Sequence, residues 1–311
     1  MSGPIEESDR VTTNLGISAI EVKEGRTTHI GELGILRVLP TKRRRTIGPW
    51  CFVDLMSPGD VEQPPPLEIG PHPHIGLATV TWLFDGLVLH SDSLGTQQPI
   101  RPGELNLMTA GHGIAHAEEG LETRTPEDTG GIMGVQMWLA QPSGTRDGDS
   151  GFQHLKDLPE VDVTGGRGRL LIGEYGPNRS AAVFEQPAIG LDLQLETGAI
   201  VVTEPSFEYG IVPIDRSFRV EDAIVEPGSV AVVPLGYEQL RFESLGPGRL
   251  MILGGLPLGE EVKMWWNFVA RTEDEISEAW RAWQSHNTDR FGEVPSGLAR
   301  IEAPRPPWLG N

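Results

Sequence analysis

Short apolar runs follow one another along most of the chain, and glycine, proline or aspartate separates each run from the next. In the first half these runs include "ATVTWLF", "LVLHSD", "LNLMTA" and "GVQMWLA", and in the second half "GRLLIGEYG", "LDLQLE" and "VAVVPL". Evenly spaced short strands of this kind are typical of a β-sandwich or β-barrel. The 39 glycines and 26 prolines suit strands joined by tight turns. We therefore predict an all-β fold.

An internal repeat indicates that the chain contains two similar domains. Residues 100–111 read "IRPGELNLMTAG" and residues 225–236 read "VEPGSVAVVPLG". Each copy has a Pro-Gly turn that leads into an apolar strand and ends at glycine. The polar stretch "QPSGTRDGDSG" places the domain joint near 141–165. We expect one barrel domain over 1–145 and a second over 160–311.

The end of the chain has a different periodicity. The stretch "TEDEISEAWRAWQS" begins at Thr272, and Glu275 follows three residues later, which is the spacing of a capping box. Apolar residues then recur at helical spacing at Ile276, Ala279, Trp280 and Trp283. We predict a helix that docks on one of the barrels, and we assign it to the second domain.

Charge and cysteine content exclude several classes of protein. The 311 residues carry a formal net charge of −19, which disfavours direct binding to nucleic acid. The basic run from Lys42 to Arg45 is interpreted as a solvated loop. Cys51 is the single cysteine, so no disulfide forms within the chain. We find no signal peptide and no apolar run long enough to span a membrane, and we expect a cytoplasmic protein.

Histidine placement is the feature that indicates chemistry. Five of the eight histidines lie between residues 72 and 116. His72 and His74 are two positions apart, as are His116 and Glu118, and residues at this spacing share one face of a strand. Two such pairs on neighbouring strands would give three imidazoles and one carboxylate. That donor set suits a divalent first-row metal such as iron, manganese, nickel, copper or zinc, and it leaves coordination positions open for catalysis.

Longer motifs around these residues resemble the pirin family of the cupin superfamily. They are "HPHIGLATVTWLFDGLVLHSDSLG", "IRPGELNLMTAGHGIAHAEE", "GPWCFVDLMSPG", "GVQMWLAQP" and "MWWNFVART". The resemblance covers roughly residues 25–290. It implies a bicupin, which consists of two tandem jelly-roll barrels, here with a C-terminal α-helix. In such proteins the first barrel holds one metal and the second is usually empty, which agrees with the lack of histidine from 155 to 285.

The same resemblance implies a set of ligands and an activity. Its metal ligands correspond here to His72, His74, His116 and Glu118. Ala78 stands where many pirins have glutamate, so Glu118 is the carboxylate expected. We expect Fe²⁺, with manganese, nickel, copper or zinc as alternatives. The implied reaction is that of a quercetin 2,3-dioxygenase, in which O2 opens a flavonol or similar aromatic enol and Glu118 also acts as the base.

A second function is compatible with the same residues. Some pirins regulate transcription factors or metabolic enzymes, so the alternative is a non-catalytic, metal-dependent regulatory protein with a protein partner. The acidic surface argues against direct contact with DNA but not against a basic protein partner.

Several other residues of the motifs have simpler interpretations. His90 and Asp92 share a strand face, and we favour a surface pair over a hydrogen bond behind the metal ligands. His112 lies either at the entrance of the site or in a loop without a role. The remaining candidates are interpreted as residues of the hydrophobic core, and they are Met108, Met133, Met137 and Trp138. In an alternative interpretation, some of them line an apolar pocket for an aromatic substrate.

Overall fold

The computed structural model describes most of the chain as β-structure. The described residues are 19–30, 33–42, 44–56, 67–121 and 131–310. Residues 1–18, for which the sequence predicts no signal peptide, lie outside them. No helix in the described ranges has the length and apolar character needed to cross a bilayer.

The chain folds into two compact units that are not sequential. Among the described residues, the first unit lies within 27–36, 53–157 and 258–310, and the second within 19–26, 37–52 and 158–257. The domains expected at 1–145 and 160–311 are sequential, whereas residues 37–52 of the first expected domain fall in the second unit. The N-terminal strand belongs to the second unit, and the C-terminal helix belongs to the first.

The first unit contains two antiparallel sheets that face each other. The smaller sheet has the order β5 (Glu68–His74), β10 (Ile114–Gly120), β7 (Val88–Asp92), β8 (Gln97–Ile100). The larger has the order β12 (Gly151–Leu155), β9 (Leu105–Thr109), β6 (Leu77–Asp85), β11 (Met133–Ala140), β4 (Trp50–Met56), β3 (Leu33–Leu39), β2 (Arg26–Ile30). Residue 26 of β2 and residues 37–39 and 50–52 of β3 and β4 fall in the ranges of the second unit. Trp138 of β11 lies against His74 of β5, so side chains of the two sheets meet in the interior.

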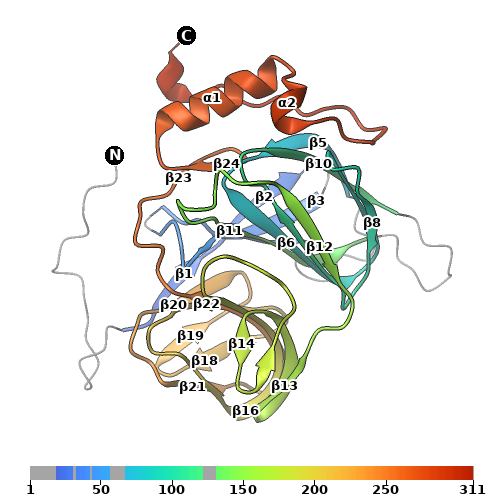
Figure 1. Cartoon of the computed structure of the whole chain (residues 1–311). Helices are drawn as coiled ribbons and strands as arrows, with labels where there is room; N and C mark the ends of the chain where they lie inside the picture. Colours follow the sequence, from blue (N-terminus) through green and yellow to red (C-terminus); the bar gives the residue numbers. More distant parts are fainter. Residues whose placement is uncertain (1–18, 31–32, 43, 57–66, 122–130, 311) are drawn as a thin grey trace. The chain divides into compact units, whose positions relative to one another are not determined.

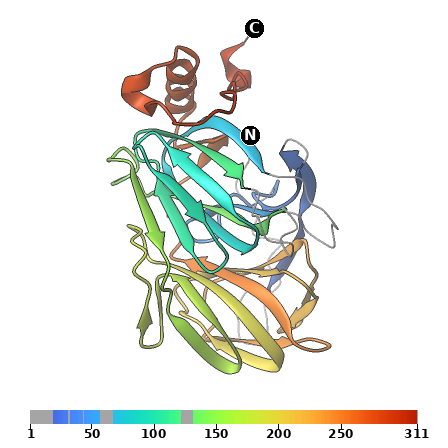
Figure 2. The ribbon, with the colours of Figure 1, turned by 90° about the vertical axis from the view of Figure 1, so that its right-hand side faces the viewer.

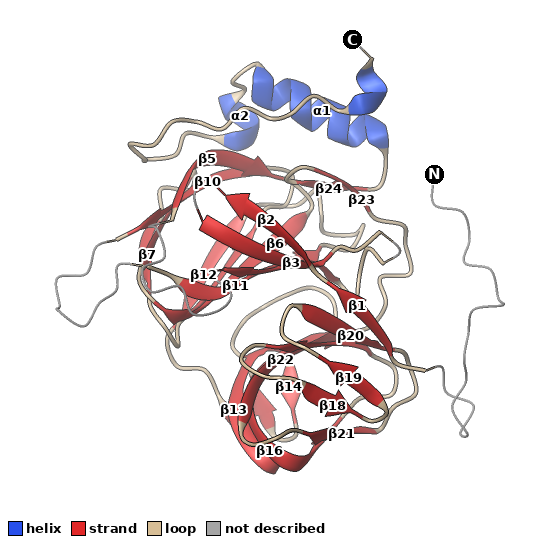
Figure 3. Cartoon of the chain, turned by 180° about the vertical axis from the view of Figure 1, so that it is seen from behind, coloured by secondary structure: helices blue, strands red, loops and turns tan. Residues whose placement is uncertain are grey.

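The C-terminal segment covers the outer face of the smaller sheet. It consists of the hairpin β23 (Lys263–Trp265) and β24 (Phe268–Ala270), then α1 (Glu273–Gln284), α2 (Thr288–Phe291) and the 3₁₀ turn η2 (Pro307–Leu309). Figure 1 shows α1 and α2 beside β5 and β10, and Figure 2 and Figure 3 show the same arrangement from other sides.

The predicted helix and its cap are confirmed. The Thr272 hydroxyl accepts from the Glu275 N–H, and the Glu275 carboxylate accepts from the Thr272 N–H, which makes a complete capping box. The buried face of α1 packs against strand residues of the first unit, namely Ile75, Ala115, Phe268 and Ala270. The helix therefore docks on the barrel that carries the histidines, since that is where the apolar surface complementary to Ile276 and Trp283 lies.

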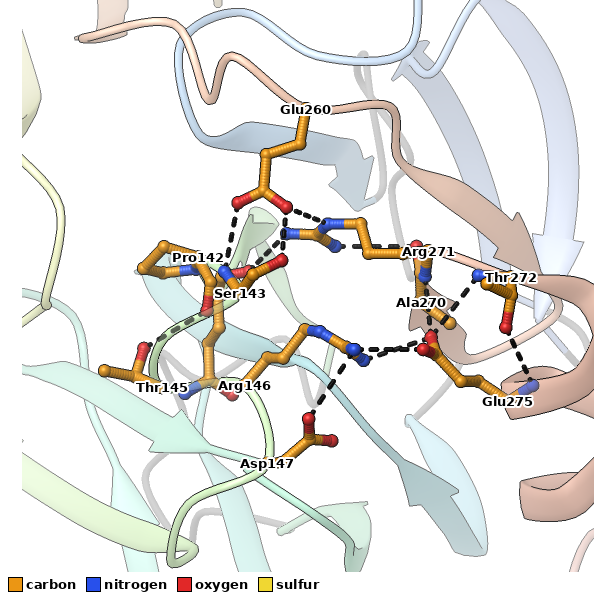
Figure 4. Close-up of polar contacts among 11 residues, drawn as sticks. Pro142, Ser143, Thr145, Arg146, Asp147, Glu260, Ala270, Arg271, Thr272 and Glu275 are labelled. Carbon is orange, nitrogen blue, oxygen red and sulfur yellow. Dashed lines mark hydrogen bonds and ion pairs between the residues drawn. The ribbon is translucent and has the colours of Figure 1, made fainter.

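Two arginine–glutamate pairs hold this segment in place (Figure 4). Arg146 donates two hydrogen bonds to the Glu275 carboxylate, at 3.1 and 2.9 Å. Glu260 accepts from the backbone N–H and hydroxyl of Ser143 and from Arg271. The bonds from Ser143 and Arg271 lower the pKa of Glu260 to about 2. We call these five residues the clamp.

The second unit is built on one nine-stranded sheet. The order is β1 (Glu21–Glu24), β20 (Ser229–Val233), β17 (Glu208–Pro213), β22 (Gly248–Gly255), β16 (Ala188–Val202), β21 (Gln239–Glu243), β18 (Phe218–Val220), β19 (Ala223–Val225), and β13 (Glu160–Ile172) also pairs with β16. A short hairpin joins β14 (Glu174–Tyr175) to β15 (Asn178–Arg179). The hydrophobic core of the second unit includes Leu191, Leu193, Ile211, Phe218, Phe242 and Ile252. Because β1 pairs with β20, an N-terminal strand covers what would otherwise be a free sheet edge.

The predicted repeat corresponds to one structural unit in each barrel. The Glu104 N–H bonds to the Arg101 carbonyl, and the Ser229 N–H bonds to the Glu226 carbonyl. Gly103 and Gly228 have φ of 84° and 88°, as the third residue of a type II turn requires. Each turn leads directly into a buried strand, β9 or β20. The duplicated turn and strand are therefore confirmed.

Candidate metal centre

Three histidines meet on the inner face of the smaller sheet. His72 and His74 lie on β5, as their spacing predicts, and His116 on β10 is paired directly with His72. Proline has no N–H, so a strand that contains Pro71 and Pro73 belongs at a sheet edge, and β5 is an edge strand of its sheet. The three rings have centroids 4.3 to 5.0 Å apart. Their donor nitrogens lie within 4.8 Å of one another.

Backbone carbonyls fix the tautomers of the two histidines on β5. The Nδ1 of His72 lies 2.9 Å from the Gly70 oxygen, and the Nδ1 of His74 lies 3.0 Å from the Asn267 oxygen. A carbonyl oxygen only accepts, so each Nδ1 must carry the proton. Each Nε2 therefore presents a lone pair to the space between the rings.

Two further side chains, those of His90 and Asp92, orient the ring of His116. The Nε2 of His90 lies 3.1 Å from the Asp92 carboxylate, and the Nδ1 of His90 lies 3.4 Å from the Nδ1 of His116. Burial acts to raise the pKa of Asp92, but hydrogen bonds from His90 and Thr96 outweigh it and lower that pKa, so Asp92 is an acceptor. In the tautomer in which the His90 Nε2–H donates to Asp92, the His90 Nδ1 accepts from the His116 Nδ1–H, and the Nε2 of His116 is unprotonated.

In this tautomer the three Nε2 lone pairs point to one place. The Nε2 atoms of His74 and His116 are 3.1 Å apart. Two nitrogen ligands about 2.1 Å from one ion and at right angles to each other lie about 3.0 Å apart, so this separation is that of neighbouring ligands. Burial lowers the pKa of His72 to about 4, and burial also lowers those of His74 and His116 well below the usual value. Neutral imidazole is the form that binds metals.

Glu118 approaches this cluster from one side. It follows His116 on β10 and is paired with His90 on β7. A register shift against β5 falls between His116 and Glu118. The Glu118 carboxylate groups with His90 and His116, within 4.8 Å, rather than with all three ligand histidines predicted from the sequence. Burial raises the pKa of Glu118, and the nearby His90 ring offsets this only in part.

The preferred interpretation of His90 and Asp92 as a surface pair is wrong. The two residues are buried and hydrogen-bonded to each other, and His90 reaches His116. Their spacing does indicate the shared strand face, but only the pairing of β7 with β10 places that face inside. His112 is exposed in a loop. Of the four predicted core residues, Met108, Met137 and Trp138 are buried and Met133 is 39% exposed.

Comparison with known proteins identifies the family. The family models described as Pirin and Pirin C-terminal cupin domain match residues 32–139 and 190–291. A Pseudomonas aeruginosa protein named "Putative quercetin 2,3-dioxygenase" is 39% identical over 282 residues, which cover 89% of this chain and 87% of that protein.

The chain belongs to the pirin family. A pirin-like protein of Caulobacter vibrioides is 34% identical over 281 residues, covering 85% of this pirin and 92% of that protein. The crystal structure of quercetin 2,3-dioxygenase from Acinetobacter baumannii superimposes with a TM-score of 0.86 and 38% identity, covering 93% and 96% of the two chains. The predicted bicupin fold is therefore confirmed.

The C-terminal segment of this pirin contributes directly to the histidine cluster. The Asn267 carbonyl that holds His74 lies in the two-residue turn between β23 and β24. Trp266 in this turn has φ 53°, a conformation that is costly for a bulky side chain. A further bond from the Val269 N–H to the Ile75 carbonyl ties the hairpin to β5. The clamp residues Glu260 and Arg271 flank this hairpin, so the clamp helps to fix the carbonyl that orients the His74 ring. That carbonyl belongs to Asn267, which lies 193 residues from His74 in the chain.

The opposite wall of the barrel is aromatic where it meets the histidines. Trp138 lies edge-on to His74, with ring centroids 5.1 Å apart. Phe152 stacks on His90, with centroids 4.6 Å apart and an interplanar angle of 19°. Strand β12, which carries Phe152, is an element that the hydrophobic pattern did not reveal. The donor cluster thus faces apolar surface on the larger sheet.

Proposed function

We propose that this pirin binds one divalent transition-metal ion through His72, His74, His116 and Glu118, with Fe²⁺ as the expected ion. The observation that carries the proposal is the convergence of three buried imidazole rings, with two of their Nε2 atoms 3.1 Å apart. A bound cation would replace the electrostatic repulsion between the nitrogen lone pairs with coordination bonds. The same charge would compensate the buried Glu118 carboxylate, which lies within 4.8 Å of the His116 donor.

We further propose a reaction of the quercetin 2,3-dioxygenase type on a flavonol or similar aromatic enol. The names of the Pseudomonas and Acinetobacter relatives support this activity, since both align with almost the whole chain. When bound, the metal supplies a Lewis-acid site for the enol oxygen and a means of activating O2. In the overall reaction both atoms of O2 enter the ring-opened ester, the enol carbon leaves with its own oxygen as carbon monoxide, and no other reductant is needed.

The residues around the ion have separate roles in this proposal. Glu118 takes the proton of the enol hydroxyl, and the raised pKa of its buried carboxyl favours holding that proton. Trp138 and Phe152 provide apolar surface on which an aromatic ring packs opposite the donors. The Asp92–His90 pair keeps the Nδ1 proton of His116 in place, and so keeps its Nε2 available.

The test is anaerobic reconstitution of the chelator-treated protein with iron(II), manganese, nickel, copper or zinc in turn. Metal content is measured first, and then O2 uptake and carbon monoxide release with quercetin. His116→Ala and Glu118→Ala remove proposed ligands from β10. His112→Ala is the matched control, because it removes an exposed histidine four residues from His116.

Metal-dependent O2 uptake that is lost in both ligand variants and kept in the control supports the proposal. Stoichiometric metal binding without uptake overturns the dioxygenase reaction and leaves the metal site standing. Equal metal content in the parent protein and in His116→Ala overturns the metal site itself.

A further inference from the structure

A second row of inward-facing residues lies beside the aromatic wall. The first row crosses the larger sheet through residues that are paired strand by strand: Trp138 with Thr79, Thr79 with Met108, and Met108 with Phe152. Since Trp138 and Phe152 contact the histidines, the whole row faces the interior. Residues two positions along each strand face the same way and lie about 7 Å further on.

This second row is polar, in contrast to the first. It consists of Gln136, Thr81, Asn106 and His154, which are paired across the same four strands. Thr81 and Asn106 are 4% and 3% exposed. We call these four residues the polar row. A polar row inside a barrel is costly unless its hydrogen bonds are made.

The hydrogen bonds within the polar row are incomplete. Thr81 donates to the Gln136 side-chain oxygen at 2.8 Å, and the His154 Nδ1 lies 2.5 Å from the Asn106 Oδ1. The Asn106 Nδ2 is buried and has no partner among the described residues. If the amide is turned over, its oxygen takes the unpartnered position instead, so one polar atom of Asn106 stays free in either orientation.

A hydroxyl group satisfies that free atom in both orientations, because it both donates and accepts. We propose that the polar row, with Asn106 as its central member, binds a hydroxyl group on the ring of the aromatic ligand that lies away from the metal-binding enol. This inference rests on the proposed function in one respect, namely that the other end of the ligand lies at the histidine cluster. Asn106 is then a specificity-determining residue, and ligands without the hydroxyl leave it unsatisfied.

The test measures binding rather than turnover, so that it is independent of the dioxygenase reaction. Three flavonols are titrated into the metal-loaded protein under nitrogen, and the first is 3-hydroxyflavone. Galangin carries two more hydroxyls than 3-hydroxyflavone, both on the fused ring, and kaempferol carries these two and a third on the separate phenyl ring. We expect at least one added hydroxyl to increase affinity about tenfold in the parent protein. Asn106→Leu, which has a similar volume and no polar group, is expected to remove that increase.

Ser91→Ala is the matched control. The Ser91 hydroxyl is also buried without a partner among the described residues. It alternates with His90 and Asp92 on β7, so it faces away from the interior. This variant is expected to keep the full preference for hydroxylated flavonols. His154→Phe provides a second variant of the polar row, and it is also expected to weaken the preference.

The outcomes separate the two proposals. Loss of the hydroxyl preference in Asn106→Leu, with metal content unchanged, supports the inference whether or not the protein consumes O2. Three results overturn the inference. They are an equal loss of affinity for all three flavonols in Asn106→Leu, no change in any of the three affinities in that variant, and no binding of any flavonol by the parent protein. If the unpartnered Asn106 atom bonds only to an interior water, the substitution changes the affinity for none of the three flavonols.

Discussion

Burial of His72 predicts how the metal-free protein responds to acid. Burial lowers the pKa of this ring from 6.5 to about 4. Above pH 6.5 the ring is neutral in both the folded and the unfolded chain. As the pH falls from 6.5 towards 4, only the unfolded chain takes up the proton, so the free energy of unfolding decreases. At pH 5 these two pKa values give a loss of about 2 kcal/mol from His72 alone.

The assay is urea unfolding of chelator-treated protein at pH 7.5 and pH 5, for the parent and for His72→Asn. Asparagine keeps an N–H donor for the Gly70 carbonyl and removes the titration. The 44 acidic residues are common to both proteins. His72 also lowers the pKa of His74 and of His116, so its removal makes these two rings less sensitive to acid and adds to the difference in the same direction. The parent should lose about 2 kcal/mol more than the variant between the two pH values. The same pH dependence in both proteins would refute the reasoning that His72 is held neutral by burial.

Three further predictions concern the C-terminal segment. Thr272→Ala removes the helix cap and should lower the free energy of unfolding by about 1 kcal/mol, measured by urea unfolding. Arg146→Lys loses the bidentate bond to Glu275, so limited proteolysis should cut the C-terminal segment faster than in the parent. Gly70→Ala places a methyl carbon 1.9 Å from the Ala299 oxygen, so it should displace the segment beyond α2. Because the Gly70 carbonyl orients the His72 ring by a hydrogen bond, the same substitution should lower the affinity for metal. Unchanged proteolysis or metal affinity, respectively, would contradict the last two.

The sequence could predict those features that depend on neighbours in the chain. Strand alternation was sufficient to put His72 with His74, and His116 with Glu118, on common strand faces. The capping box at Thr272 and the Pro-Gly turns at the start of both repeats are likewise local patterns. Each of these was visible because its physical cause acts over a few residues.

What the sequence could not predict depends on pairing between distant strands. His90 and Asp92 looked like a surface pair because nothing near them shows that β7 lies beside β10. The docking of α1 on the first unit depends on apolar side chains such as Phe268, whose surroundings are set by tertiary packing. The polar row became visible only from the register of four strands, which brings Asn106 opposite His154.

The bond between His74 and Asn267 also has a consequence for the order of events during synthesis. The two residues are 193 positions apart. At about 5–20 residues per second, a ribosome needs about 10 to 40 s to add the second after the first. During that interval the strands of the first unit can pair, but the ring of His74 lacks the carbonyl that sets its tautomer. The nascent chain therefore completes the surroundings of its histidine cluster only after residue 267 has been added, when the whole second unit, which ends at Pro257, has already been made.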